Sequence, residues 1–257
     1  MVMVVVFIGA AGSGKSSLVR SFGSWIRRNL FLRVAQVNLD PGAEIIPYEP
    51  VFDIRDIFTL HDVMRAYNLG PNGGFIKASE LIAEKTDIIL SNEPFSNISE
   101  WDVVLIDTPG QMEAFIFRPA STYFFHKLSS IVNLIGVYII DCSAINRLSD
   151  AITLWFLGLL AQIKTGLLTV PVVNKIDIAE NIEYARLLIE APEKLIELAK
   201  KERSEGLLSD IAPELLNIAL KTKQALRPVE VCAKDGRGME ELYYLIHEAF
   251  CTCGDLT

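Results

Sequence analysis

The chain places a glycine-rich loop directly after an apolar run of strand length, and this pairing constrains its fold more than any other feature. Residues 9–16 read Gly-Ala-Ala-Gly-Ser-Gly-Lys-Ser and fit the pattern G-x-x-x-x-G-K-S/T, with the apolar run 4–8 immediately before them. In this pattern backbone N–H groups surround phosphate oxygens, the lysine reaches the β- and γ-phosphates, and the hydroxyl ligates Mg²⁺. A helix that begins near Lys15 would add its positive dipole end behind the phosphates. The segment therefore predicts binding of a nucleoside triphosphate.

The alternative is an ordinary turn of small residues between a strand and a helix. Eight matching residues, in register with an apolar strand and a helical segment, favour a phosphate-binding loop with Mg²⁺ as cofactor. The residues assigned to nucleotide binding are Gly12, Ser13, Gly14, Lys15, Ser16 and Ser17, and Ser16 is also assigned to the metal.

Composition excludes several other classes of protein. The chain has 257 residues, of which 51% are hydrophobic, and this favours a sheet that is buried on both faces. The net charge is −8 and no basic stripe is visible, so we expect no direct binding of nucleic acid. No apolar window reaches the roughly 18–20 residues of a membrane span. The first apolar run leads straight into the phosphate loop, so it is a strand and not a signal peptide, and we expect a cytoplasmic protein.

Strand-like runs alternate with helical patterns along the chain. After a helix at 16–30, the further strand-like runs are 34–39, 103–106, 134–140, 169–173 and 228–232. This alternation predicts an α/β fold of the P-loop NTPase type, with a mostly parallel sheet and helices on both faces. We expect a single domain over residues 1–257, with helical insertions at about 53–92 and 181–226. The first insertion contains a turn at 69–74.

The tetrapeptide Asn174-Lys175-Ile176-Asp177 follows the fifth predicted strand and matches N-K-x-D. Guanine offers two adjacent N–H donors that the carboxylate of Asp177 can accept together, whereas adenine would leave it unpaired. Asn174 would tie this loop to the phosphate loop, and the stem of Lys175 would cover the base. The alternative is a strand-to-helix cap, in which Asn and Asp are common. The position after a phosphate loop and a strand favours guanine recognition.

Two further segments resemble GTPase motifs. The segment 107–110 reads Asp-Thr-Pro-Gly and matches D-x-x-G, in which Asp107 would reach Mg²⁺ through water and the Gly110 N–H would meet the γ-phosphate. Gln111 follows, where many GTPases orient the attacking water. After the last predicted strand, the segment Cys232, Ala233 and Lys234 resembles the loop whose backbone N–H reads guanine O6, with cysteine in place of the usual serine.

The chain is similar to the GPN-loop GTPases, in the manner of a prokaryotic-type member. The resemblance rests on Gly70-Pro71-Asn72 between the second and third long apolar runs, and on the segments 38–42 and 107–113. It implies a dimer whose nucleotide sites face each other, with the Gly-Pro-Asn loop reaching the partner's site near the γ-phosphate. It also implies, by analogy, a client protein in the assembly of RNA polymerase.

The same resemblance implies catalytic roles for six residues: Asp40, Gln111, Glu113, Gly70, Pro71 and Asn72. Asp40 is assigned to the metal as well. Each has an ordinary alternative. An aspartate before Pro-Gly is a natural turn residue, Glu113 could cap a helix or pair with Arg118, and Pro-Asn-Gly-Gly forms turns in many proteins. Ala10 stands where related dimeric proteins carry a second lysine that crosses the dimer, so another group would be needed there.

These motifs predict a dimeric GTPase that hydrolyses GTP to GDP and phosphate with Mg²⁺ and acts as a nucleotide-dependent switch or assembly factor. One alternative is a metallochaperone-type GTPase, for which Cys251 and Cys253 are the candidate ligands, although neither they nor the three histidines have the spacing of a tetrahedral site. The other is a scaffold that binds GTP without hydrolysing it.

Overall fold

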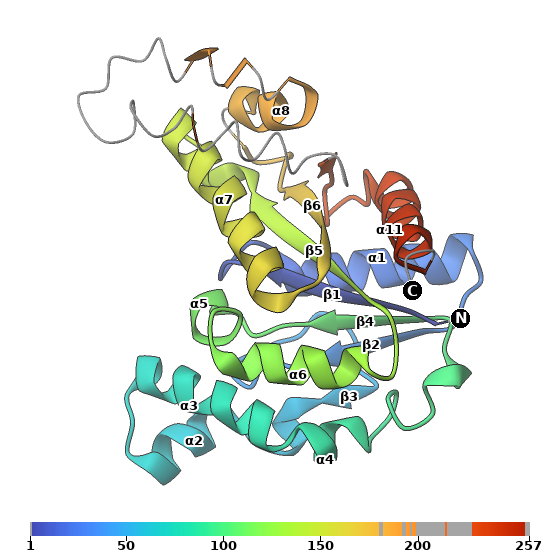
Figure 1. Cartoon of the computed structure of the whole chain (residues 1–257), viewed down its shortest axis with the longest axis vertical. Coiled ribbons are helices and arrows are strands. Elements are labelled where there is room, and N and C mark those ends of the chain that lie inside the picture. The colour runs from blue at the N-terminus through green and yellow to red at the C-terminus, as the bar shows by residue number, and fades with distance from the viewer. Residues whose placement is uncertain are drawn as a thin grey trace.

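The computed structural model of the chain describes residues 2–179, 182–191, 194–195, 197–198, 214 and 228–254. In this part of the chain a seven-stranded sheet has all neighbouring strands parallel, in the order β3-β2-β4-β1-β5-β6-β7 (Figure 1). The strands are β1 (Met3–Gly9), β2 (Val34–Asn38), β3 (Phe52–Asp53), β4 (Val103–Asp107), β5 (Leu134–Asp141), β6 (Leu168–Asn174) and β7 (Val229–Glu230). The predicted α/β fold with a mostly parallel sheet is confirmed.

The central strand β1 is buried along its whole length because the sheet is covered on both faces. Its side chains alternate between two hydrophobic clusters. Val4, Val6 and Ile8 belong to one cluster, and Met3, Val5 and Phe7 belong to the other. A continuous apolar run in the sequence thus corresponds to a strand with a core on each side.

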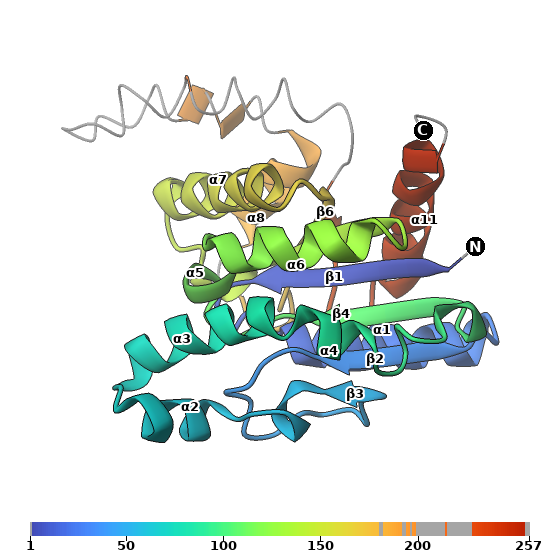
Figure 2. The ribbon, with the colours of Figure 1, turned by 60° about the horizontal axis from the view of Figure 1, so that its bottom comes forward.

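Helices divide between the two faces (Figures 1 and 2). α1 (Lys15–Asn29) and α11 (Met239–Gly254) pack on the cluster that contains Phe7. The other face is covered by α3 (Pro71–Glu84), α4 (Thr86–Leu90), α5 (Met112–Phe115), α6 (Pro119–Ser129) and α7 (Leu148–Thr165), with α2 (Leu60–Tyr67) packed on α3 and α8 (Glu183–Glu190) on α7. Short 3₁₀ turns are η1 (Ile54–Asp56), η2 (Ile98–Glu100) and η3 (Cys142–Ala144).

The insertion expected at 53–92 is largely helical, but it begins with an unpredicted strand, β3, which pairs with the end of β2. The turn predicted at 69–74 is also only partly right. Gly70 is the N-cap of α3, and Pro71 and Asn72 lie in the first helical turn. Proline fits this place because its fixed φ suits a helix start and its missing N–H is not needed there. The Gly-Pro-Asn segment is therefore a helix N-terminus.

In the second expected insertion, 181–226, the structure describes α8, and the rest of the predicted helical pair lies outside the described residues apart from a few positions. Among the helices that are described, none combines the length and apolar character needed to cross a membrane. The amino end of β1 and the carboxyl end of α11 lie at the same end of the molecule, opposite the arrowheads of the strands (Figures 1 and 2).

Candidate nucleotide site

The loop between β1 and α1 lies at the carboxyl edge of the sheet. Gly12 and Gly14 have positive φ values of 77° and 93°, which favour glycine strongly over residues with a side chain. At Gly14 a side chain is excluded by the positive φ and also by a clash, since a Cβ would lie 2.5 Å from Asn174 Nδ2. The loop then passes into α1 at Lys15, with Gly14 as the N-cap. This strand, loop and helix have the arrangement that phosphate binding needs.

Lys15 is buried and its ammonium group faces the interior of the loop. Nζ donates to the carbonyl oxygens of Gly9 at 2.7 Å, Ala10 at 2.9 Å and Gly110 at 3.4 Å. Burial lowers the pKa of Lys15, while the nearby carboxylates of Asp107, Asp40 and Glu113 act to raise it. A cation is thus held where the phosphate loop meets the segment after β4.

Two buried polar atoms beside this lysine have no hydrogen-bond partner among the described residues. They are Ser13 Oγ and Asp107 Oδ1. Burial raises the pKa of Asp107 to about 6, against the opposing effects of Ser16, Lys15 and Tyr48. Unpaired buried polar atoms are costly, so this pair indicates a place where a polar ligand completes the site.

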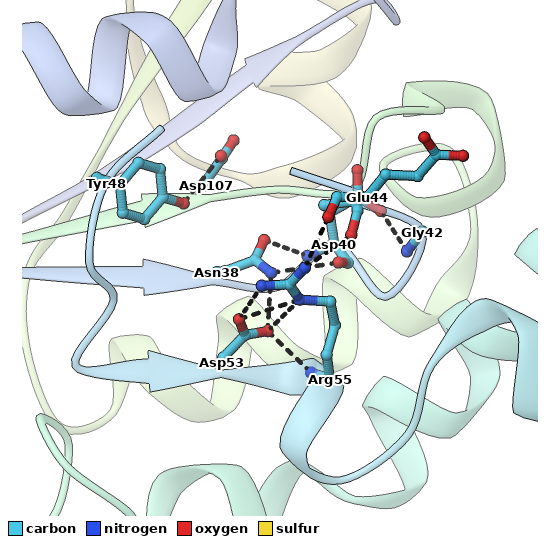
Figure 3. Close-up of polar contacts among 9 residues, drawn as sticks. Asn38, Asp40, Gly42, Glu44, Tyr48, Asp53, Arg55 and Asp107 are labelled. Atoms are coloured by element: carbon cyan, nitrogen blue, oxygen red, sulfur yellow. Dashed lines mark hydrogen bonds and ion pairs between the residues drawn. The ribbon is translucent and has the colours of Figure 1, made fainter. Parts of the chain in front are cut away.

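The second oxygen of Asp107 has a partner that the sequence reasoning missed. Tyr48 donates its hydroxyl to Asp107 Oδ2 at 2.9 Å (Figure 3). The tyrosine lies on the connection between β2 and β3, and the two residues are 59 positions apart in the chain. No sequence motif around Tyr48 predicts this contact.

Asp40, which follows β2, directs its carboxylate into the same region. Oδ1 accepts the Gly42 N–H at 2.8 Å, and Oδ2 accepts the Gly110 N–H at 2.7 Å. Burial raises the pKa of Asp40, although the two amides and Lys15 act to lower it. The Gly110 N–H that the motif assigns to the γ-phosphate is therefore bonded to a carboxylate in this structure. Asp40 and Gly110 join the loop after β2 to the loop after β4.

The residues of the expected guanine site come together at the ends of β6 and β7. Asn174 Nδ2 donates to Ser13 O at 3.0 Å, and Asn174 Oδ1 accepts the Ala233 N–H at 3.2 Å. One backbone N–H of the loop expected to read guanine O6 is thus bonded to Asn174 here. Asp177 lies close enough to the Cys232 thiol to raise its pKa, a smaller effect than that of burial. Asn174 consequently bridges the phosphate loop and the loop after β7.

Two further contacts that the sequence did not reveal hold these loops. Lys175 Nζ forms a 2.6 Å ion pair with Asp141 Oδ2 at the end of β5. Ser21 on α1 donates its hydroxyl to Ala233 O. A cavity of about 640 Å³ beside α1 is lined by Ser17, Arg20, Ser21, Ser24, Trp25, Arg27, Arg28 and residues 233–236. The predicted residues Ser17, Ala233 and Lys234 therefore share one hollow.

The remaining catalytic candidates lie at the starts of helices. Gln111 is the N-cap of α5, and the exposed Glu113 follows in its first turn, with no ion pair to Arg118 in the described part of the chain. Gly70, Pro71 and Asn72 are exposed at the start of α3. Both ribbon views place this tip beyond the carboxyl ends of the strands (Figures 1 and 2). No hydrogen bond between the tip and the phosphate loop of the same chain occurs among the described residues.

Within the described residues there is no group of three or more His, Cys, Asp and Glu side chains that could hold a metal ion. Cys251 is exposed on α11, with its Sγ 3.7 Å from His247 Nδ1, and the side chain of Cys253 lies outside the described part. This end of α11 is far along the helix from the loop after β7.

The chain is similar in sequence to known proteins over most of its length. A family profile described as "Conserved hypothetical ATP binding protein" matches residues 7–252. The "GPN-loop GTPase PAB0955" of Pyrococcus abyssi is 35% identical over 99% of this chain and 100% of its own length. "GPN-loop GTPase 1" of Dictyostelium discoideum is 29% identical over 93% of this chain, which spans 59% of that longer protein.

A solved structure is also similar along its whole length. The crystal structure of PAB0955, titled "a GTPase in Apo form from Pyrococcus abyssi", has a TM-score of 0.86 and 32% identity, covering 98% of each chain. Fold and site together define a P-loop GTPase. The chain belongs to the GPN-loop GTPase family.

Proposed function

We propose that this protein hydrolyses GTP to GDP and phosphate with Mg²⁺. The observation that carries the proposal is the pair of buried, unpartnered oxygens of Ser13 and Asp107 beside the buried cation of Lys15. Phosphate oxygens complement Lys15 and the loop amides, and no covalent chemistry is needed from the protein. Catalysis would come from positioning and from stabilisation of charge.

The oxygens present suit Mg²⁺. Magnesium prefers hydroxyl, carboxylate and water oxygens. Asp107 Oδ1 is a buried carboxylate oxygen with no hydrogen-bond partner among the described residues, and the Ser16 hydroxyl lies close enough to Asp107 to act on its pKa. Ser16, Asp107 and Asp40 are the residues proposed to hold it. When bound, the metal neutralises negative charge on the β- and γ-phosphates. Gln111 and Glu113 are proposed to orient the attacking water at the start of α5.

We further propose that two copies of the chain pair with their nucleotide sites facing each other, and that the α3 tip of one reaches the site of the other. The exposure of Gly70, Pro71 and Asn72 beyond the strand ends supports this arrangement. Such a dimer would act in the cytoplasm as a nucleotide-dependent switch or assembly factor. By analogy with the family, its client would be the RNA polymerase assembly machinery.

The test of this function is base-specific hydrolysis under single-turnover conditions. Wild-type protein should cleave GTP with Mg²⁺, lose that activity with EDTA, and bind ATP far more weakly. Asp177→Asn removes one of the two acceptors that face guanine, so its GTP affinity should fall by about 10- to 100-fold while xanthosine triphosphate is gained. The matched control Asp102→Asn alters a carboxylate that pairs with Arg33 at the opposite end of the strands, and it should leave GTP affinity unchanged. Equal binding of ATP and GTP by the wild type would refute the assignment of Asp177.

A further inference from the structure

The turn that carries Asp40 is held by three polar residues (Figure 3). Asn38 belongs to the segment 38–42 named above, whereas Asp53 and Arg55 lie outside the recognised motifs. Asn38 Oδ1 accepts the backbone N–H of Asp40 at 3.0 Å, and Asn38 Nδ2 donates to Asp53 Oδ1 at 2.9 Å. Asn38 ends β2 and is fully buried, while Asp53 ends the neighbouring strand β3. The unpredicted strand β3 therefore places Asp53 directly behind the turn.

Arg55 holds the other end of the turn, at Ala43. Its guanidinium contacts Asp53 with two parallel bonds, from Nε to Oδ1 at 3.0 Å and from Nη2 to Oδ2 at 2.6 Å. The remaining nitrogen, Nη1, donates to the carbonyl oxygen of Ala43 at 2.9 Å. Bidentate pairing of this kind fixes the orientation of a guanidinium in a way that a lysine cannot reproduce.

The pair between Asp53 and Arg55 is partly buried and remains ionised. Burial opposes the charged form of Asp53, yet hydrogen bonds from Arg55 hold the pKa of Asp53 below its usual value. Both ends of the turn 40–43 are thus fixed, at Asp40 through Asn38 and at Ala43 through Arg55. Within this frame the Asp40 carboxylate is aimed at the Gly110 N–H, 2.7 Å away.

We propose that Arg55 is a positioning residue for GTP hydrolysis, which acts through Asp40. Arg55 makes no hydrogen bond with the phosphate loop among the described residues, so it would act through Asp40, by holding the turn and by its positive charge near the Asp40 carboxylate. Loss of the guanidinium would release Ala43 and let the Asp40 carboxylate shift away from Gly110. This inference rests on the proposed hydrolysis of GTP.

The test is a double-mutant comparison of single-turnover GTP cleavage in the full chain. Arg55→Met should lower the rate by about 10- to 100-fold, because a displacement of about 1 Å at a reacting group costs on that order. Its GTP affinity should stay within about threefold of wild type, since Lys15 and Asp177 are untouched. Arg55→Met combined with Asp40→Asn should be no slower than Asp40→Asn alone, because both changes remove the same contribution. Arg55→Lys should stay closer to Arg55→Met than to wild type.

The matched control is Arg33→Met, which breaks a 3.2 Å ion pair with Asp102 at the opposite edge of the sheet. It should leave the rate unchanged in both backgrounds. The positioning role would be overturned if the double variant lost the product of the two single fold-losses, or if either single variant kept the wild-type rate. Either result would leave the proposed GTP hydrolysis intact. A wild-type chain that binds but does not cleave GTP would instead refute the proposed function. Unfolding temperatures of all variants separate a local effect from loss of the fold.

Discussion

The two carboxylate oxygens of Asp107 have different surroundings. Oδ2 accepts the Tyr48 hydroxyl, whereas Oδ1 has no partner among the described residues. The tyrosine thus orients the carboxylate and leaves one oxygen available to the Mg²⁺ site that we propose. Groups that orient metal ligands in this way tune metal affinity without touching the metal.

Tyr48→Phe should therefore weaken Mg²⁺ binding to the GTP complex by about tenfold, the low end of what loss of such a partner costs. The measurement is the Mg²⁺ concentration at half-maximal change in fluorescence of a labelled GTP. Tyr123→Phe is the control, since Tyr123 is half exposed on α6. An Mg²⁺ midpoint shared by both variants and the wild type would show that Tyr48 only fills space.

At the scale of elements, the sequence predicts six of the seven strands in the described part of the chain and misses β3. β1, β5 and β6 are apolar runs buried on both faces, so composition alone identifies them. β3 contains only Phe52 and Asp53, which is too short for any period, and it exists because it pairs with β2. The start of α3 was misread because Pro-Asn-Gly-Gly suits a turn as well as a helix start.

The candidate site divides in the same way. Its motif residues follow strands directly, so order along the chain indicates their meeting at one edge of the sheet. Tyr48, Asp53, Arg55 and Asp141 escape that reasoning, since they act through contacts made only after folding. The Asn174 bridge between two loops is the one such contact that the motif itself suggested in part.

The connection from β7 to α11 offers a stability test at the scale of an element. Gly238 has φ +77°, and a Cβ there would lie 2.0 Å from the backbone oxygen of Glu230. Gly236 has φ +83° with open space around it. Gly236→Ala should cost about 1–2 kcal/mol through its left-handed backbone alone, and Gly238→Ala clearly more because of the added clash. Urea unfolding of both variants measures the difference, and equal losses would contradict the clash.

At the scale of the whole molecule, the proposed dimer predicts complementation between inactive chains. Lys15→Ala removes the phosphate cation, and Asn72→Ala removes the polar side chain at the tip of α3. If Asn72 acts on its partner's nucleotide, each alone should be nearly inactive, with GTP affinity retained in Asn72→Ala, because its contact would strengthen as charge develops. Mixing the two should restore hydrolysis, because one site of each mixed dimer has an intact loop facing an intact Asn72.

Recovery is to be measured as GTP cleavage after mixing, with mixed dimers verified by mass. The control mixes Lys15→Ala chains with Gln111→Ala chains. Both residues are proposed to act on their own chain's nucleotide, so neither site of the mixed dimer is intact and no activity should return. Mixed dimers that form but stay inactive would place the role of Asn72 within its own chain.

The shared location of the amino end of β1 and the carboxyl end of α11 has a practical consequence (Figure 1). A dye, an affinity handle or a surface tether attached at the carboxyl end of α11 would lie at the end of the sheet opposite the candidate nucleotide site. Immobilised chains would thus present their nucleotide-binding edge to solution.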